Sequence, residues 1–333
     1  MKKIINNPTD VVSEALMGMQ AAYPDKLVYT PKMEVISRKE KKTDKVAVIS
    51  GGGAGHEPLH AGFVGKGMLD AAISGNVFSS PSPDRIGSAI EQVSCGKGVL
   101  MVIKNYSGDI MNFGLSADLA EMDDIEVAQV IVKDDVAVPD REEGTGRRGI
   151  AGTVFVHKIA GAKAEQGASL AEVKAAAEKA VRNIRTMGVA LTPCIVPQVG
   201  EPTFSIADDE IEIGMGIHGE KGIEVRKMMT ADEVADILVE RITADMPLVS
   251  GDEVSVMVNG LGATPLEEQL IVYGRVHKLL KDKGVKVFMP HVGEFATSME
   301  MAGLSLTIFK LDEELKALLA APAKTPFYTN YNK

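Results

Sequence analysis

One sequence feature constrains the fold of this chain most. It is a short apolar run followed by three glycines and a histidine, VAVISGGGAGHEPLH, residues 46–60. A continuous apolar run is typical of a buried parallel strand, and glycines after it let the backbone turn tightly and approach a ligand. The pattern predicts that His56 lies on a loop at the carboxyl end of a strand. Ligands bind at this edge of open α/β sheets, so His56 is a candidate for chemistry. The alternative is a structural turn whose histidine only hydrogen-bonds a neighbour.

The glycine segment does not match the common nucleotide-binding motifs. A P-loop needs Gly-x-x-x-x-Gly-Lys-Ser/Thr, and the required lysine is missing here. In the dinucleotide fingerprint Gly-x-Gly-x-x-Gly, His56 occupies the place of the last glycine. We therefore interpret residues 51–55 as a loop that admits a small ligand rather than a nucleotide.

Length, charge and cysteine content narrow the class of protein. The chain has 333 residues, more than one hydrophobic core usually holds, so we expect two domains. Its net charge of −10 argues against nucleic acid or an anionic membrane as the main partner. No apolar run approaches the ~20 residues of a membrane span, and no secretory signal is found, which favours a cytoplasmic protein. Cys95 and Cys194 lack ligand-like spacing, which indicates reduced thiols and no structural zinc site.

Strands alternate with helices through the first half of the sequence. Short apolar runs predict strands at residues 46–50, 71–74, 99–104 and 127–132. Helical patterns are found at residues 8–23, 83–93, 111–121, 150–164 and 169–187. Because strands and helices alternate, we expect a mainly parallel sheet with right-handed crossovers.

The second half has a different pattern. Glycine and proline punctuate Gly188–Pro197, which we interpret as the end of the preceding helix and the domain junction. Strand-like runs follow at residues 210–219, 253–262 and 285–293, with helices at 231–243 and 264–282. Alternation over Glu210–Met215 predicts a mixed or antiparallel sheet. The predicted fold is therefore α/β with two α/β domains, residues 1–187 and residues 188–333.

A second candidate for chemistry lies in VIKNYSGDIMNF, residues 102–113. Lys104 and Asp109 follow an apolar strand, at the end where a parallel sheet binds ligands. A lysine and a carboxylate on one turn can orient a substrate hydroxyl and remove its proton. Aspartate is also a preferred N-cap, so Asp109 can instead cap a helix starting near Ile110. From this segment alone the cap is the favoured interpretation.

The remaining histidines differ in their surroundings. His218 lies between glycines in GMGIHGEKG, residues 214–222, which leaves its imidazole unshielded. A neutral histidine nitrogen can act as a nucleophile, although most lone histidines do no chemistry. His60, His157 and His277 fall in apolar or helical patterns and are predicted to be packing or surface residues, and His291 stays ambiguous.

Arg147 and Arg148 stand beside glycines and before a predicted helix. Paired guanidiniums with backbone N–H groups at a helix start suit an anionic group. Solvated loop arginines are the commoner outcome, and we favour that interpretation.

Taken together, these segments resemble the dihydroxyacetone kinase family, and within it the separate substrate-binding subunits that depend on the bacterial phosphotransferase system (PTS). The motifs are GGGAGHEPLHAGFVGKGML, NYSGDIMNF, GRRGIAGTVFVHKIAG, GIHGE and NGLGATPLEEQLIV. The resemblance covers nearly the full length. One departure is Ala54, where many relatives carry serine.

The resemblance implies roles for single residues. His218 matches the histidine that forms a covalent hemiaminal with the ketone carbon of dihydroxyacetone. His56 and Asp109 match the catalytic histidine and aspartate, and the choice of proton acceptor between them stays open. The substrate-binding set that it implies is Gly53, Ala54, Gly55, His56, Lys104, Asp109 and His218.

The resemblance also implies a reaction and its partners. We expect a phosphotransferase subunit that helps to convert dihydroxyacetone to its phosphate, with the phosphoryl group coming from a separate subunit that carries ADP and Mg²⁺. No cofactor is expected on this chain, which ends at Lys333 without a further nucleotide-binding segment, and a homodimer is expected. The main alternative is a dihydroxyacetone-sensing transcriptional co-activator, and a third is a stand-alone carbonyl-binding protein.

Overall fold

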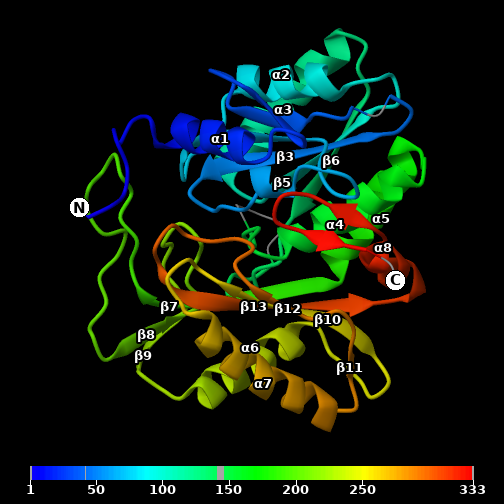
Figure 1. The fold of residues 1–333 in the computed structure, drawn as a ribbon. Coiled ribbons are helices and arrows are strands. Elements are labelled where there is room, and N and C mark those ends of the chain that lie inside the picture. Colours follow the sequence, from blue (N-terminus) through cyan, green and yellow to red (C-terminus); the bar gives the residue numbers. More distant parts are fainter. Residues whose placement is uncertain (1, 42, 141–145, 332–333) are drawn as a thin grey trace.

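Two β-sheets alternate with layers of helices in this protein (Figure 1). The structure is a computed structural model, and it describes residues 2–41, 43–140 and 146–331. From top to bottom in Figure 1, the layers are helices α2 (Pro83–Val93) and α3 (Ser107–Met122), the first sheet, helices α4 (Thr153–Glu165), α5 (Leu170–Arg182) and α8 (Glu313–Ala320), the second sheet, and helices α6 (Ala231–Asp245) and α7 (Leu266–Asp282). The α/β class is therefore confirmed.

The first sheet has six strands in the order β1-β2-β4-β3-β5-β6. Their bounds are β1 Leu27–Thr30, β2 Val35–Arg38, β3 Ala47–Ala54, β4 Ala71–Val77, β5 Val99–Lys104 and β6 Val127–Val132. The last four run parallel, whereas β1 and β2 add to the edge beside β4 in antiparallel pairs. The mainly parallel sheet is confirmed, and the four predicted strands are found. The edge pair β1 and β2 was not predicted.

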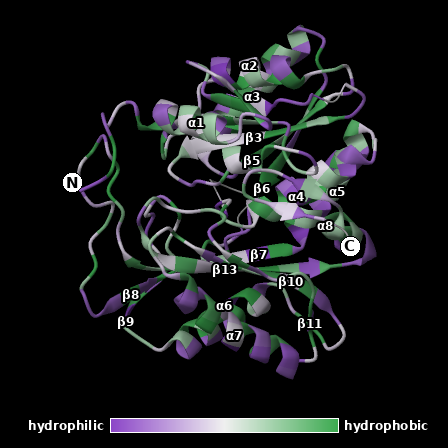
Figure 2. Cartoon of the chain, viewed as in Figure 1, coloured by the Kyte–Doolittle hydropathy of each residue, from purple (hydrophilic) through white to green (hydrophobic). Residues whose placement is uncertain are grey.

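Apolar side chains fill both faces of the first sheet. One core packs α2 and α3 against strand residues such as Ile49 and Ile103. The other core joins the opposite face to α4, α5 and α8, and to helix α1 (Val11–Ala22). Helix α4 is buried nearly all round, as its apolar sequence requires. It lies between the two sheets and so fixes their separation. Figure 2 shows the apolar strands in green and the hydrophilic outer sides of α6 and α7 in purple.

The second sheet has seven strands in the order β11-β10-β13-β7-β8-β9, and β12 also pairs with β10. Their bounds are β7 Ile184–Thr192, β8 Glu210–Ile213, β9 Glu224–Lys227, β10 Glu253–Gly260, β11 Lys286–Val287, β12 His291–Gly293 and β13 Ala302–Leu311. Only β11 and β12 run parallel to β10, and the other pairs are antiparallel, so the predicted mixed sheet is confirmed. A short ladder joins β14 (Ala323–Lys324) and β15 (Thr329–Asn330).

The helix predicted for residues 169–187 ends early. It begins at a capping box between Ser169 and Glu172 and stops at Arg182, and the chain then enters the central strand β7. Strand β7 is paired on both sides, with β13 and β8, and this pairing outweighs the helical pattern of its first residues. The predicted domain boundary after residue 187 lies inside β7, and the division into two domains stays a prediction.

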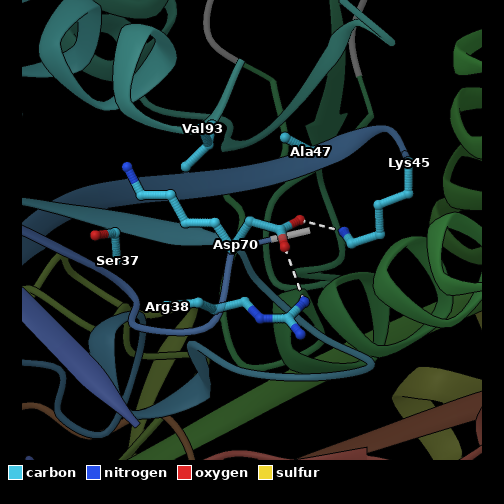
Figure 3. A pocket seen from close by; sticks show the side chains of 7 residues that line it. Ser37, Arg38, Lys45, Ala47, Asp70 and Val93 are labelled. Carbon is cyan, nitrogen blue, oxygen red and sulfur yellow. Dashed lines mark hydrogen bonds and ion pairs between the residues drawn. The ribbon is translucent and has the colours of Figure 1, made fainter. Parts of the chain in front are cut away.

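A cluster of ion pairs lies at the edge of the first sheet where strands β3 and β4 begin (Figure 3). Asp70 accepts hydrogen bonds from Arg38 Nη1 at 2.9 Å, from the Val48 backbone N–H at 2.8 Å and from Lys45 Nζ. Arg38 Nη1 also reaches Glu165 of α4 at 2.7 Å. The cavity beside this cluster measures about 20 Å³, enough for one water molecule. The cluster therefore ties the sheet to α4 and leaves no room for a larger ligand.

Within the described residues, no helix has both the length and the apolar character that a bilayer crossing requires.

Candidate active site

The glycines after the first apolar run continue strand β3 instead of forming a loop. A Cβ atom on Gly53 would lie 2.5 Å from the backbone nitrogen of Ser79, so only glycine lets the turn after β4 approach this closely. The loop prediction for residues 51–55 is therefore wrong for its first part. The turn begins at Gly55, whose φ of +97° suits glycine. His56 follows, at the carboxyl end of β3 as predicted.

His56 is a fully buried, neutral imidazole. Its Nδ1 atom lies 2.8 Å from the carbonyl oxygen of Thr297, which precedes β13, and so Nδ1 donates. Burial lowers the pKa of His56 well below its usual value, and the nearby Lys104 and His218 add to the effect. The lone pair of this histidine therefore lies on Nε2, which has no hydrogen-bond partner in the described part of the chain.

His218 is held by a carboxylate two residues later. Its Nδ1 atom lies 2.8 Å from Oε1 of Glu220, and its backbone N–H donates to Oε2 of the same residue at 2.9 Å. Burial favours the neutral form of Glu220, but the hydrogen bonds from the side chain and backbone of His218 lower the pKa of the carboxyl to about 2. An ionised Glu220 accepts the Nδ1 proton in a hydrogen bond, so Nε2 of His218 keeps its lone pair.

Aromatic rings surround His218 on several sides. The ring centre of His56 lies at 4.8 Å, that of Tyr106 at 4.7 Å and that of Phe78 at 5.2 Å. The His218 side chain keeps 18% of its surface exposed, so a small molecule can reach it. Phe78 also stacks on His56 at 5.0 Å. The rings fix the two imidazoles relative to one another.

Lys104 and Asp109 form the polar side of the site. Lys104 ends β5 and is fully buried; burial lowers its pKa, whereas the carboxylates of Asp109, Glu220 and Asp134 oppose the shift. Burial raises the pKa of Asp109, against the effects of Lys104 and a hydrogen bond with Ser80. The amine and the carboxyl thus lie close enough for the charge of each to shift the pKa of the other.

Asp109 is not the cap of a helix. Helix α3 begins at Ser107, its N-cap residue is Tyr106, and Asp109 lies in the first turn, beyond the cap position. The interpretation that the isolated segment favoured is therefore wrong, because the helix begins three residues earlier than Ile110. The Asp109 carboxylate is left to face the site.

Several buried polar atoms of the site share one property: in the described part of the chain they have no hydrogen-bond partner. These are Nε2 of His56, Nζ of Lys104, the hydroxyl of Tyr106 and Oδ1 of Asp109. Native proteins leave few buried polar atoms unpaired, so a group of them at one place indicates that a ligand completes their hydrogen bonds. Donors, acceptors and two imidazole lone pairs suit a small polyhydroxylated molecule with a carbonyl.

The paired arginines have another use. Arg147 pairs with Asp245 of α6, and Arg148 Nε donates to Asp135 at 2.7 Å while its Nη2 donates to the carbonyl of Gly214 at 2.9 Å. Both side chains are buried. They are therefore neither solvated nor open to an anionic ligand. Arg148 instead anchors the start of the segment that carries His218.

Other sequence predictions can be compared directly. Gly53 and Ala54 end β3, and Gly55 makes the turn to His56, so the glycine segment, Lys104, Asp109 and His218 converge. His60 and His157 are buried, His291 is half-buried, and His277 is exposed on α7. Cys95 and Cys194 are free thiols. Over residues 2–41, 43–140 and 146–331, no three His, Cys, Asp or Glu side chains gather as metal ligands would.

Sequence reasoning missed four contributors to the site: Phe78, Tyr106, Glu220 and Thr297. Only Glu220 had a local signal, the His-x-Glu spacing in GIHGE. Thr297 lies 241 residues from His56, and no local pattern connects them.

Comparison with known proteins gives the family. The model of the Dak1 domain matches residues 17–327. The chain belongs to the Dak1 family. The predicted resemblance to dihydroxyacetone kinases is thereby confirmed, and the match spans both sheets of the structure.

Three curated relatives are similar over nearly their whole length. The PTS-dependent dihydroxyacetone kinase 1, dihydroxyacetone-binding subunit DhaK, of Listeria innocua is 53% identical over 314 residues, which covers 94% of this chain and 95% of that protein. The corresponding subunit of Lactococcus lactis is 50% identical, with 94% of each chain covered. The PEP-dependent subunit DhaK of Escherichia coli is 39% identical, with 98% of each covered.

Solved structures of the Dak1 fold agree closely with this one. The dihydroxyacetone kinase operon co-activator Dha-DhaQ superposes with a TM-score of 0.91 at 35% identity, covering 96% of this chain and 98% of that one. The dihydroxyacetone kinase of C. freundii superposes with a TM-score of 0.89 at 36% identity. This chain covers 60% of the C. freundii chain, and 99% of its own length is matched.

Proposed function

We propose that this chain is the dihydroxyacetone-binding subunit of a PTS-dependent dihydroxyacetone kinase. The observation that carries the proposal is the pair of imidazoles, His56 and His218, whose unprotonated Nε2 atoms adjoin the unpaired groups of Lys104 and Asp109. Relatives that are named as dihydroxyacetone-binding subunits match almost the full chain and support this choice.

Substrate binding begins at His218. Dihydroxyacetone has few groups to recognise, and noncovalent contacts alone discriminate poorly between such small molecules. Nε2 of His218 attacks the ketone carbon and forms a C–N bond, while the π electrons of the carbonyl move to its oxygen, which takes up a proton. The ring releases its Nδ1 proton through its partner Glu220 to solvent, and this proton balances the one that the oxygen takes from water. The neutral hemiaminal that results selects carbonyl compounds over polyols.

Phosphoryl transfer then uses the terminal hydroxyl of the bound substrate. The ammonium group of Lys104 and the backbone near Gly53 hold the hydroxyls in place. Asp109 or Nε2 of His56 accepts the hydroxyl proton as that oxygen attacks phosphorus. Much of the rate comes from this positioning, as is usual in phosphoryl transfer. The phosphoryl group would come from a separate subunit, whose bound ADP is first phosphorylated through the PTS and then leaves as ADP again, with Mg²⁺ on that subunit. This chain works as a homodimer in the cytoplasm.

Reconstitution tests this function. Purified chain is mixed with the donor subunit, the PTS phosphocarrier proteins and phosphoenolpyruvate, and dihydroxyacetone phosphate is measured. We expect product only when both subunits are present. Binding of dihydroxyacetone without any product would contradict the kinase assignment.

A second candidate is the dihydroxyacetone-sensing co-activator, because the Dha-DhaQ structure superposes over nearly the whole chain. The co-activator hypothesis expects ligand binding but no phosphoryl transfer in the same assay. The higher identity to the kinase subunits, 53% against 35%, favours the kinase.

A further inference from the structure

A second group of buried polar side chains adjoins Lys104 and has no part in the proposed reaction. His60 follows the turn after β3, and His157 lies on α4; both are buried, and their ring centres are 5.3 Å apart. In the described residues, Nε2 of His60 and both ring nitrogens of His157 lack a hydrogen-bond partner. Because buried polar atoms are rarely left unpaired, this group needs an explanation of its own.

The hydrogen-bond network assigns the tautomer of His60. The hydroxyl of Ser50 donates its single proton to the carbonyl of Val102 at 2.6 Å. Ser50 Oγ therefore accepts from Nδ1 of His60, which lies 3.0 Å away. Nδ1 thus carries the proton and Nε2 carries the lone pair. Burial, together with the charge of Lys104, lowers the pKa of His60 well below its usual value and keeps the ring neutral.

Gly52 shows how close this lone pair is to Lys104. A Cβ atom on Gly52 would lie 3.4 Å from Nε2 of His60 and 3.4 Å from Nζ of Lys104. The two nitrogens therefore flank the same side of Gly52 and are no more than twice that distance apart. Rotation of the flexible lysine stem, or one water molecule, closes such a gap. Any side chain at position 52 would fill the space between them.

We propose that His60 is a positioning residue for Lys104: its Nε2 atom accepts a hydrogen bond from the ammonium group, directly or through one water molecule, and Ser50 holds that lone pair in place. An ammonium group has three donors. When one donor is fixed on His60, the directions of the other two are set, toward the substrate hydroxyl and Asp109. The inference rests on the proposed function, in which Lys104 binds a substrate hydroxyl.

The charges that face Lys104 come from several elements. Asp109 lies in the first turn of α3, Asp134 follows β6, and Glu220 follows β8; all three favour the ammonium form. The neutral rings of His56 and His157 add no charge. Loss of the His60 acceptor would destabilise the ammonium further, so the pH above which binding weakens should fall.

The test compares His60→Leu, His60→Gln and Ser50→Ala with wild type by calorimetric titration of dihydroxyacetone across pH. The matched control is His291→Leu, which removes a half-buried histidine that bonds to Tyr328. A hydrogen bond to a charged group is worth ~1.5–3 kcal/mol, so we expect His60→Leu to weaken binding by about tenfold or more. The alkaline limb of its binding profile, where affinity falls as the pH rises, should move to lower pH. The glutamine variant keeps an acceptor and should recover most of the affinity, and the control should bind as wild type does.

The outcomes separate this inference from the proposed function. If wild type binds no dihydroxyacetone, the proposed function is wrong and the inference falls with it. If wild type binds but a folded His60→Leu binds equally well with the same pH profile, only the inference is wrong. Equal losses in the leucine and glutamine variants would indicate packing and would also overturn it. Should His60→Leu fail to fold, Ser50→Ala decides: an unchanged alkaline limb contradicts the positioning role.

Discussion

The Nδ1 atom of His218 lies 2.8 Å from Oε1 of Glu220, and the same carboxylate accepts the backbone N–H of His218. This pairing fixes both the ring orientation and the tautomer, so the free lone pair points away from Glu220. His218 and Glu220 come from one short segment after β8, whereas Lys104 ends β5 and Asp109 lies in the first turn of α3. The site therefore needs both sheets in place.

Replacing Glu220 by glutamine should weaken hemiaminal formation. The amide keeps the size of the side chain, but it removes the negative charge that stabilises the ring as Nε2 adds to the ketone. We expect the affinity for dihydroxyacetone to fall, with the ring still in place. Carbon-13 NMR of dihydroxyacetone labelled at the ketone carbon measures the adduct, because the carbonyl signal is replaced by that of a tetrahedral carbon. A full adduct signal in Glu220→Gln, or any in His218→Ala, would show that this assignment is wrong.

Asp109→Asn should bind substrate but lose most phosphoryl transfer. The amide preserves size and hydrogen bonding while it removes the base, and general acid–base residues contribute ~10²–10⁴ in rate. Calorimetry gives the binding, and the reconstituted assay with the donor subunit gives the turnover. Near-normal turnover would leave His56 as the proton acceptor, and His56→Asn would then carry the loss.

The first sheet could be predicted well because its signals are local. Each parallel strand is a short apolar run, so the strands that end at Ala54 and Lys104 were found from their own residues, although the first was predicted to end at Ser50. The edge strands β1 and β2 are only four residues each and carry polar residues, so no comparable run marks them. The glycines after β3 misled in another way. These glycines allow the neighbouring backbone to approach closely. The sequence of β3 alone does not show this requirement, because it depends on β4 lying beside it.

The site was predicted in part for a similar reason. His56, Asp109 and His218 each follow a strand or stand between glycines, so their positions are marked along the chain. Glu220 acts through a hydrogen bond at a short spacing, and Thr297 acts through a contact between the two sheets. The burial of Arg148 could not be predicted either, because it depends on the packing of distant elements. The local motif does not show that Arg148 pairs with Asp135.

Substitution of two glycines by alanine should have opposite effects. On Gly53 a Cβ atom would collide with the backbone of Ser79, so Gly53→Ala should destabilise the fold and weaken dihydroxyacetone binding. Gly114 lies inside α3 with open space around it, so Gly114→Ala should stabilise the protein by ~0.4–1 kcal/mol. Urea unfolding of both variants measures the free energies. Equal effects at the two positions would contradict the close approach of the strand glycines.

A lysine buried between α4 and α8 should make the free energy of unfolding change with pH in the alkaline range. Nζ of Lys158 donates to the carbonyl of Leu318 at 2.6 Å, and burial lowers its pKa from 10.5 to about 7. Between these two values the unfolded chain binds more protons than the folded chain, so the free energy of unfolding should rise as the pH increases from 7 to 10.5. Lys158→Met keeps the apolar stem and removes the titrating group. The variant should therefore be more stable relative to wild type at pH 7 than at pH 10, as urea unfolding at a series of pH values would measure.

Lys174→Met, at an exposed ion pair of α5, is the control and should leave the pH dependence unchanged. Parallel stability curves for wild type and Lys158→Met would show that Lys158 is not held in the neutral form by burial.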